Sequence, residues 1–441
     1  MSHDPSGTDL PGLAADPPAG PPGAVAATSR GLPNHPAPGL PIRPTGPGTS
    51  AAHLVGALRS AIREVPSLLP NVTEGAARAP VLDRLTGSPS EPVEASPERL
   101  ALCCPDGDPE DSGPRPGYAE RPWGDGSHPP LYCPETVRVD EDLGDQVDEA
   151  LVAWAEKTGI YADRLETFRS TGFGRLAMLA HPDTDDPDRL LLAAQMNAAW
   201  WACDDYYADE SELGATPIEL PPRLALVMSA MDPPPPAGEY TGPLEEALRA
   251  DPVLVALASA AAHLRRHAAP SQVMRVCNTT FQMYVSWTAY AAWRYQGGLP
   301  PAWRYLAARQ HDSFYTSMTL IDVVGGYRLP AELFAAPPVH RALMQAGTAA
   351  VIVNDLHSVA REAADEQSDN LVLLVAAEEH CSLREAIEVC VRLHNGFVRA
   401  FQSAQERLAA VPSAELQRFL RGAQAWMGGG FEWHSTSSRY R

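Results

Sequence analysis

Proline is distributed unevenly along this chain of 441 residues, and this limits where a compact fold can form. Residues 1–134 contain 26 of the 44 prolines, which leaves 18 for the remaining 307 residues. The first part is also rich in Gly, Ala, Ser and Asp and has little hydrophobic periodicity, so it cannot bury enough apolar surface to offset chain entropy. We therefore predict a disordered arm over residues 1–125 and one folded domain over residues 126–441.

From about residue 131 onward the hydrophobic pattern is helical. In residues 140–158, for example, Leu143, Val147 and Trp154 recur at the spacing of one helix face. Further helices or helix pairs are expected over residues 161–179, 190–207, 243–267, 272–295, 301–324, 338–364, 371–378, 382–411 and 414–427. Because alternating β-branched residues are scarce, the pattern predicts an all-α domain, a bundle of roughly ten or more helices around one core.

The composition argues against several classes of partner. The formal net charge of −21 makes nucleic acid and anionic membrane surfaces poor partners. No stretch approaches the ~18 apolar residues of a membrane helix, and residues 1–10 lack the basic start and apolar core of a secretory signal. The seven cysteines include no C-x-x-C pair, which favours free thiols in a reducing cytoplasm over disulfides or a cysteine zinc site.

The stretch N-D-L-H-S-V-A-R-E at residues 354–362 combines two kinds of polar side chain. Asn354, Ser358 and Glu362 follow one another at intervals of four, so on a helix they lie within about 80° of one another. Their oxygens suit a hard divalent cation, and Arg361 offers donors that fit phosphate. A solvated helix face is the alternative, but the apolar run just before the stretch favours a buried helix. We therefore predict a cation site next to an anion contact, as a metal-bridged diphosphate requires.

A second acidic stretch, D-D-Y-Y-A-D-E at residues 204–210, ends one of the expected apolar helices. Asp204 and Asp205 repel each other there and face the negative end of the helix dipole. A bound cation would remove both penalties, whereas a lone pair of aspartates is more often a solvated helix end. The presence of the other oxygen-rich stretch favours the cation.

Two such stretches, about 150 residues apart on an apolar helical bundle, resemble the arrangement of class I terpene cyclases. The resemblance covers roughly residue 131 to the C-terminus. Four motifs carry it in this order: D-D-Y-Y-A-D at 204–209, Y-L-A-A-R-Q-H-D-S at 305–313, N-D-L-H-S-V-A-R-E at 354–362 and R-Y at 439–440. The resemblance implies a class I terpenoid synthase-type bundle and a lyase that ionises a prenyl diphosphate.

The resemblance also implies a role for each matching residue. A cluster of Mg²⁺, expected to hold three ions, is assigned the ligands Asp204, Asp209, Asn354, Ser358 and Glu362. The diphosphate is assigned the donors Arg309, Arg361, Arg439 and Tyr440. Among the catalytic residues, Arg309 corresponds to the diphosphate sensor, Asp312 to the linker, and Ser313 lies near the expected helix break. Asp205 is expected to support an arginine. Many family members place the third acid at the position of Ala208, whereas Asp209 matches a D-D-x-x-x-D variant.

Finer similarities indicate one branch of the family. The proline-rich arm, P-P-L-Y-C-P-E at 129–135, I-D-V-V-G-G-Y at 321–327 and E-W-H-S-T-S-S-R-Y at 432–440 are similar to actinobacterial 2-methylisoborneol synthases. That branch implies conversion of 2-methylgeranyl diphosphate, an eleven-carbon substrate, and water into a bornane-type alcohol and diphosphate. The expected partner is this small molecule, the expected location is the cytoplasm, and a homodimer is left open.

The hydrocarbon part of such a substrate needs an apolar, aromatic cavity beneath the metals. Trp200 and Trp201 lie about one turn before the acidic stretch and Asn197 about two turns before it, so they are cavity candidates together with Phe314 and Trp433. Ordinary core packing is the alternative for each. The tryptophan pair favours a pocket for ten or eleven carbons rather than fifteen. No catalytic base is identified.

Other functions stay open at this point. Another class I cyclase would use geranyl or farnesyl diphosphate, and a helical prenyl-diphosphate-binding protein would show no turnover. A chain-elongating synthase would carry a second D-D-x-x-D where this chain has N-D-L-H-S at 354–358. The D-T-D-D at 183–186 matches the acid motif of class II cyclases, but the flanking Pro182 and Pro187 predict a solvent loop instead.

Overall fold

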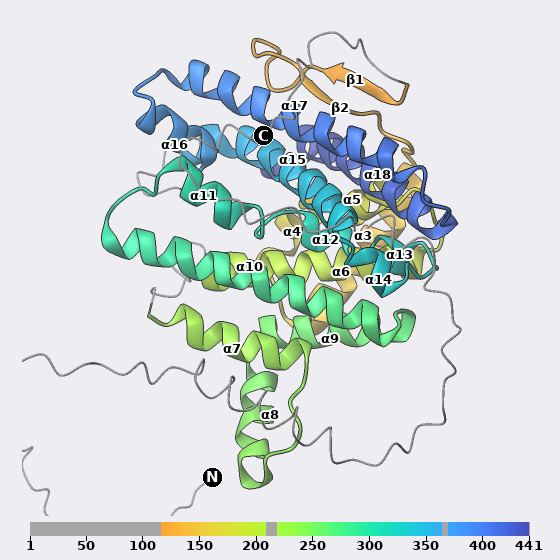
Figure 1. Cartoon of the computed structure of the whole chain (residues 1–441). Coiled ribbons are helices and arrows are strands. Elements are labelled where there is room, and N and C mark those ends of the chain that lie inside the picture. The colour runs from red at the N-terminus through yellow and green to blue at the C-terminus, as the bar shows by residue number, and fades with distance from the viewer. Residues whose placement is uncertain (1–115, 209–217, 364–368, 441) are drawn as a thin grey trace, which may run out of the picture. The chain divides into compact units, whose positions relative to one another are not determined.

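The computed structural model describes residues 116–208, 218–363 and 369–440 (Figure 1). In these residues the regular secondary structure is helical apart from one short two-stranded sheet, which confirms the expected all-α fold class. The α-helices are α3 (Glu141–Thr158), α4 (Leu165–Thr171), α5 (Phe173–Ala180), α6 (Pro187–Cys203), α7 (Leu220–Met231), α8 (Thr241–Ala250), α9 (Pro252–His267), α10 (Pro270–Gln296), α11 (Ala302–Arg309), α12 (Tyr315–Met318), α13 (Ile321–Val324), α14 (Ala331–Phe334), α15 (Pro337–Glu362), α16 (Leu371–Glu378), α17 (Leu383–Leu408) and α18 (Ala414–Thr436). Nearly all of the predicted arm lies outside the described residues, so the arm stays a prediction.

A two-stranded antiparallel ribbon precedes the helices. β1 (Tyr118–Arg121) pairs with β2 (Leu131–Pro134), and β2 packs against α17 and α18 (Figure 1). All four residues of β2 are buried, and so is Trp123 in the intervening turn. β1 lies before residue 126, where the sequence predicts the start of the folded domain.

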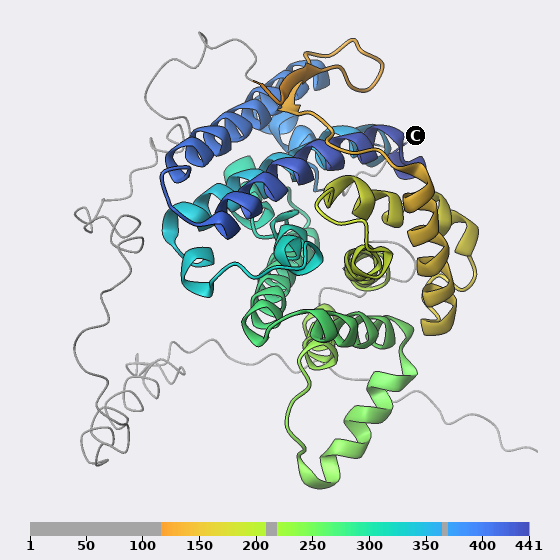
Figure 2. The same ribbon diagram turned by 90° about the vertical axis from the view of Figure 1, so that its right-hand side faces the viewer.

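Helix α6 lies in the middle of the bundle and positions the first acidic stretch. Figure 2 shows it nearly end-on, surrounded by other helices, and it packs against α3, α5 and α9. Its many alanines are buried, because small side chains let neighbouring helices approach closely. Asp186 caps its N-terminus by accepting a hydrogen bond from the backbone of Asp188 at 3.0 Å, and Pro187 follows as the first helical residue. The D-T-D-D at 183–186 is therefore a loop and a helix cap, as expected.

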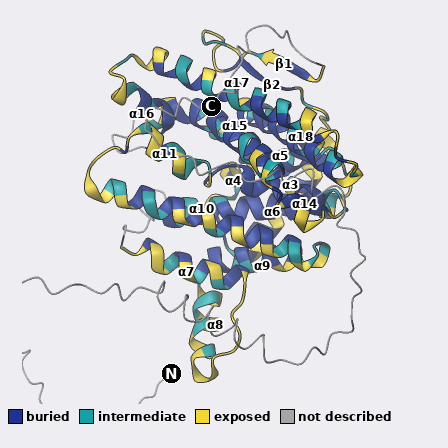
Figure 3. Ribbon diagram, in the orientation of Figure 1, coloured by how far each residue is buried: buried dark blue, intermediate teal, exposed yellow. Residues whose placement is uncertain are grey.

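The predicted apolar faces point into the core, as in α3, where Leu143, Val147 and Trp154 are all buried. Figure 3 shows the contrast between buried helices such as α6 and the exposed α8, in which no residue is buried. The sequence pattern did not predict α7, which starts with Pro221 and Pro222 at its first turn. Prolines there are compatible with a helix start, because the first backbone N–H groups have no partner within the helix.

The last helix is longer than predicted, because α18 continues through Gly428, Gly429 and Gly430 to Thr436. Three glycines suggest a helix end by propensity. A Cβ on Gly428 would lie 2.6 Å from the carbonyl oxygen of Glu135, and one on Gly429 would lie 2.4 Å from that of Leu179. The glycines therefore allow close backbone packing, and the extended helix brings the C-terminus to the site described below.

Among the described residues, no single helix combines the length and apolar composition needed to cross a membrane. Only α8 and α9 with the short segment before them meet those criteria as a pair, and the pair is bent by 98°. The five described cysteines are all free thiols.

Candidate active site

A cavity of about 470 Å³ lies where the end of α6, the middle of α10, the break between α11 and α12, and the second half of α15 meet. It combines an aromatic part with a charged part. The charged residues that line it are Asp204, Arg294, Arg309, Asp312, Asp355, Arg361, Glu362, Asp369 and Arg439. Segments far apart in the sequence therefore bring acids and arginines to one opening.

The oxygen-rich stretch of α15 contributes one side of the cavity. Asn354 and Glu362 line it directly, while Ser358 lies between them and is buried, 2 % exposed. The side chain of Asn370 donates hydrogen bonds to Glu362 Oε2 at 2.8 Å and to Ser358 Oγ at 3.3 Å. Asn370, the cap of α16, thus fixes two of the predicted metal ligands from the next helix.

Arg309 is held by a dense set of acceptors at the end of α11. Its guanidinium donates to Asp355 Oδ1 at 2.6 Å, Asp312 Oδ2 at 2.8 Å and Asn354 Oδ1 at 3.1 Å. Burial raises the pKa of the Asp355 carboxyl to about 6 even though Arg309 acts in the opposite direction. The predicted sensor is therefore joined to the oxygen-rich helix through an aspartate that the sequence did not single out.

The break between α11 and α12 falls where the sequence predicts it. Trp287 Nε1 donates to Asp312 Oδ1 at 3.0 Å, which orients that carboxylate toward Arg309. Ser313 Oγ donates to the carbonyl of Gln310 at 2.8 Å and accepts from the backbone of Tyr315. The break thus places Asp312 and Ser313 in the cavity wall beside Arg309.

On the opposite side, Asp204 opens a short π-helix, Asp204–Ala208, that continues α6. Asp204 lines the cavity, whereas Asp205 accepts a hydrogen bond from Tyr161 at 2.7 Å and one from Arg439 at 3.2 Å. Arg294 Nη2 donates to the last carbonyl of the π-helix, that of Ala208. Asp209 lies outside the described residues.

The C-terminal pair reaches the same opening. Burial opposes the charge of Arg439, but Asp205 and Tyr440 hold the pKa of Arg439 above its usual range. Asn354 Nδ2 donates to the Tyr440 hydroxyl at 2.7 Å and lies 3.4 Å from His434 Nε2. Burial lowers the pKa of His434 to about 3, so its ring is neutral here. Arg361 also lines the opening but has a side chain that is 56 % exposed.

Aromatic side chains form the lower part of the cavity. Trp200, Trp201 and Phe314, all predicted from the sequence, line it. Three further lining residues on α10, Met283, Trp287 and Tyr290, were not predicted from the sequence, although their spacing of four and three residues marks one helix face. Tyr305 completes the wall below Arg309.

Two predicted cavity residues lie behind this wall. Asn197 is buried, and its side chain accepts from Ser317 Oγ at 2.7 Å, so Ser317 rather than Asn197 reaches the cavity. Trp433 Nε1 donates to the carbonyls of Thr171 and Gly172, which turns its ring into the core against Trp201. Both support lining residues and do not line the cavity themselves.

Comparisons with known proteins show similarity at the level of family, sequence and structure. The family described as terpene synthase family 2, C-terminal metal binding, matches residues 195–400. The 2-methylisoborneol synthase of Streptomyces ambofaciens is 36% identical over 315 residues, 70% of each chain. That of Streptomyces griseus is 36% identical over 318 residues, 71% of each chain. A crystal structure of 2-methylisoborneol synthase from Streptomyces coelicolor A3(2) with Mg²⁺ and 2-fluoroneryl diphosphate has a TM-score of 0.67 and 33% identity, and the match covers 75% of this chain and 98% of that one.

Proposed function

Because this chain belongs to the class I terpene synthase family and is a terpene cyclase, we propose that it converts 2-methylgeranyl diphosphate and water into 2-methylisoborneol and diphosphate. The observation that carries the reaction type is the convergence of oxygen ligands and arginines above an aromatic cavity. The similarity to 2-methylisoborneol synthases supports the choice of substrate. The cavity volume of about 470 Å³ lies in the lower half of the ~300–1,000 Å³ usual for ligand pockets, which favours a short prenyl chain.

The donor set fits Mg²⁺. The side chains proposed as ligands of three ions are Asp204, Asp209, Asn354, Ser358 and Glu362. All offer hard oxygen atoms, and no imidazole or thiol is found among the described residues that line the cavity. When bound, the ions neutralise the charge that develops on the diphosphate as the carbon–oxygen bond breaks.

The arginines and Tyr440 hold the leaving group. Arg309 comes from the end of α11 and Arg439 from the C-terminal turn Ser438–Tyr440, each already oriented by an aspartate, and Arg361 also lines the opening. Donors that are fixed before the reaction need no reorganisation as negative charge grows, so they lower the barrier to ionisation. Asp312 takes part by fixing the guanidinium of Arg309.

The aromatic wall confines and stabilises the allylic cation. Trp200, Trp201, Trp287 and Phe314 line the cavity. Ring faces attract cations by about 0.5–2 kcal/mol each, and an apolar lining excludes stray water that would end the reaction early. The shape of this aromatic wall determines which ring the substrate forms when it cyclises.

Formation of an alcohol requires one water molecule at the last cation. We propose that Tyr290 holds it, because this residue lines the cavity and its buried hydroxyl has no hydrogen-bond partner among the described residues. A buried hydroxyl without a partner costs free energy unless water satisfies it. Tyr290→Phe is expected to raise the ratio of olefin to alcohol, measured by gas chromatography, and an unchanged ratio would assign the water to another group.

The substrate is tested by offering geranyl, 2-methylgeranyl and farnesyl diphosphates in competition, with Mg²⁺ present and with Mg²⁺ chelated. We expect 2-methylisoborneol as the main product and no diphosphate release after chelation. A dominant fifteen-carbon product, or an olefin without alcohol from the eleven-carbon substrate, would refute this substrate and product while leaving the family assignment in place. Because one methyl group changes discrimination by only ~1–3 kcal/mol, the competition must be run in one vessel.

A further inference from the structure

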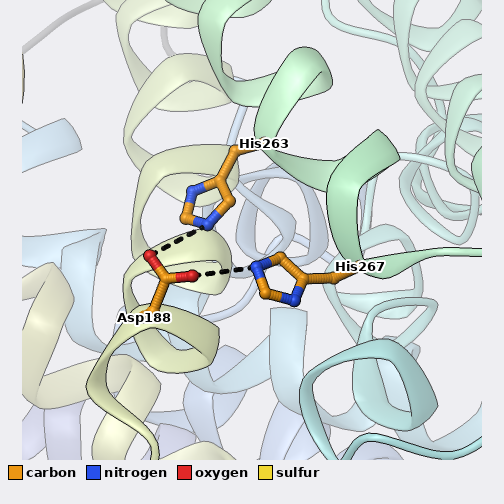
Figure 4. A group of neighbouring side chains, drawn as sticks. All are labelled: Asp188, His263 and His267. Carbon is orange, nitrogen blue, oxygen red and sulfur yellow. Dashed lines mark hydrogen bonds and ion pairs between the residues drawn. The ribbon is translucent and has the colours of Figure 1, made fainter.

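A second group of candidate metal ligands lies away from the active site, where the start of α6 meets the end of α9. Asp188 is in the first turn of α6, and His263 and His267 are four residues apart in the last two turns of α9. Figure 4 shows both imidazoles directed at the one carboxylate. Their candidate ligand atoms all lie within 4.8 Å of one another. Asp188 at the start of α6 and Asp204, the first residue after α6, are sixteen residues apart, about 24 Å along the helix axis, so the two sites are separate.

Helix-end electrostatics explain part of this arrangement. An aspartate is favourable in the first turn of a helix and histidines are favourable in the last turn. His267 Nε2 lies 2.9 Å from Asp188 Oδ2, which is an ordinary hydrogen-bond distance. A simple His–Asp contact would account for these two residues alone.

His263 is not explained in the same way. Its side chain is 3 % exposed, and its Nδ1 lies 2.7 Å from Oε1 of the buried Gln195. Since an amide oxygen only accepts, this contact places a ring proton on Nδ1, and the neutral ring then has its lone pair on Nε2. That Nε2 atom faces Asp188 Oδ1 at 3.3 Å, a contact that pairs the two groups without hydrogen-bond geometry, and among the described residues Nε2 makes no hydrogen bond of good geometry. In this tautomer two electron-rich atoms face each other at the buried end of the Asp188 carboxylate contact, which is unfavourable unless a proton or a metal cation lies between them.

We propose that Asp188, His263 and His267 bind one Zn²⁺-type transition-metal ion that joins the N-terminus of α6 to the C-terminus of α9. For a tetrahedral ion with bonds of ~2.0–2.1 Å, the ligand atoms lie roughly 3.3–3.5 Å apart, close to the 3.3 Å between His263 Nε2 and Asp188 Oδ1. Imidazole ligands select Zn²⁺, Co²⁺ or Ni²⁺ over Mg²⁺. The metal therefore differs in class from the ions proposed for the active site.

The surroundings supply the other features of such a site. Gln195 accepts the Nδ1 proton of His263, the usual arrangement for a histidine whose other nitrogen binds metal. The Asp188 side chain is 55 % exposed, which gives the ion an entry path and leaves room for a water molecule as fourth ligand. The proposed role is structural, because the metal would fix the start of the central helix without contacting the substrate cavity.

The experiment uses the full chain without a polyhistidine tag, stripped of metal and then kept in excess Mg²⁺. Co²⁺ is added, its visible absorption is recorded, and bound metal per chain is measured after gel filtration. We expect one Co²⁺ per chain with a tetrahedral spectrum, and Zn²⁺ should displace it and raise Tm. His267→Ala and Asp188→Asn should each weaken binding at least tenfold and abolish the rise in Tm. Gln195→Leu should weaken it by about 10–100-fold.

His380→Asn is the matched control, since His380 is exposed, lies in the turn after α16 and has the positive φ that asparagine tolerates. It should bind Co²⁺ as the unchanged chain does. His267 and Asp188 are both partly exposed, so their variants should fold, and circular dichroism of the metal-free proteins checks this. The proposal is overturned if the unchanged chain binds no Co²⁺, or if the Asp188 and His267 variants bind it with the same stoichiometry and spectrum as the control.

Discussion

The acidic stretch at 204–210 and the oxygen-rich stretch at 354–362 each hold an arginine through an aspartate, but the two ion pairs lie in different surroundings. In each, the second residue of an adjacent pair holds an arginine, Asp205 with Arg439 and Asp355 with Arg309. The Asp355 side chain is 2 % exposed and pairs at 2.6 Å between two helices. The Asp205 side chain is 16 % exposed and pairs at 3.2 Å with the three-residue 3₁₀ turn Ser438–Tyr440.

The difference concerns how strongly each arginine is coupled to folding. Removing one partner of a buried ion pair leaves an uncompensated charge, which destabilises a protein by ~3–5 kcal/mol. The Asp205–Arg439 pair is also mostly buried, but both of its side chains keep some contact with water and Asp205 accepts a second hydrogen bond from Tyr161, so losing Arg439 should destabilise the protein less. Arg309 is therefore expected to contribute to the stability of the fold as well as to the site, whereas Arg439, near the end of the chain, is expected to contribute little to stability.

The largest effect is expected for Arg309→Ala. This change leaves Asp355 buried without its partner, so the free energy of unfolding should fall by ~3–5 kcal/mol, measured by urea denaturation. Diphosphate release should also stop. An unfolding free energy equal to that of the unchanged chain would remove the contrast between the two arginines.

Acidification should weaken the side of the bundle that carries Arg309. His394 on α17, which packs against α15, is buried, and burial lowers its pKa to about 4. Between its unfolded pKa of about 6.5 and this value the unfolded chain binds a proton that the native chain does not, so stability is lost as pH falls. At pH 5 the loss relative to pH 7 is about 2 kcal/mol from this residue. Unfolding of the unchanged chain and of His394→Gln at both pH values checks this, and equal pH dependence in the two proteins would contradict it.

Arg439→Ala should separate activity from stability. The free energy of unfolding is expected to fall by only about 1 kcal/mol, because the Asp205–Arg439 ion pair contributes little to stability and lies at the chain end. Loss of a donor to the leaving group should lower kcat by about 100-fold. Asp205→Asn is the companion variant, and it should lower kcat less because Arg439 itself remains. A loss of stability as large as that of Arg309→Ala would show that the chain end is part of the folding core.

The smallest effect is expected for Tyr440→Phe. It removes the hydroxyl that accepts from Asn354 Nδ2 at 2.7 Å and leaves the ring packed against Trp433. The unfolding free energy should change by about 0.5 kcal/mol, while the Mg²⁺ concentration for half-maximal diphosphate release should rise because Asn354 is less well oriented. Titration of activity with Mg²⁺ measures this half-maximal concentration. An unchanged value would show that Tyr440 does not influence the metal site.

The sequence predicted the parts of the site that depend on local spacing. Asn354, Ser358 and Glu362 needed only helix geometry, and the prolines beside Asp183 and Asp186 were enough to predict a loop. The roles of Asp355 and Asn370 could not be obtained in this way, because each depends on a partner far along the chain or on the next helix. Only one feature of the sequence could have pointed to Asp355. It follows directly after Asn354, just as Asp205 follows directly after Asp204.

Residue propensities gave wrong predictions at positions where tertiary packing determines the structure. The glycines in α18 suggested a helix end, but contact with the carbonyls of Glu135 and Leu179 requires a residue without Cβ. Trp433 was a plausible cavity residue by composition, and the carbonyls of Thr171 and Gly172 explain why its ring turns away. None of these carbonyl groups can be identified from the sequence near α18 itself.

The π-helix at the end of α6 has a consequence for how insertions and deletions are tolerated in this part of the chain. In an α-helix the residue that returns to the face of Asp204 is the fourth along the chain, whereas in a π-helix it is the fifth. The fourth residue here is Ala208 and the fifth is Asp209, which lies outside the described residues. The wider turn therefore absorbs one inserted residue without reversing the face on which acids recur. In general, a D-D-x-x-D spacing in an α-helix and a D-D-x-x-x-D spacing in a π-helix bring the third acid to a similar angle around the helix axis, and the two spacings differ by a single codon.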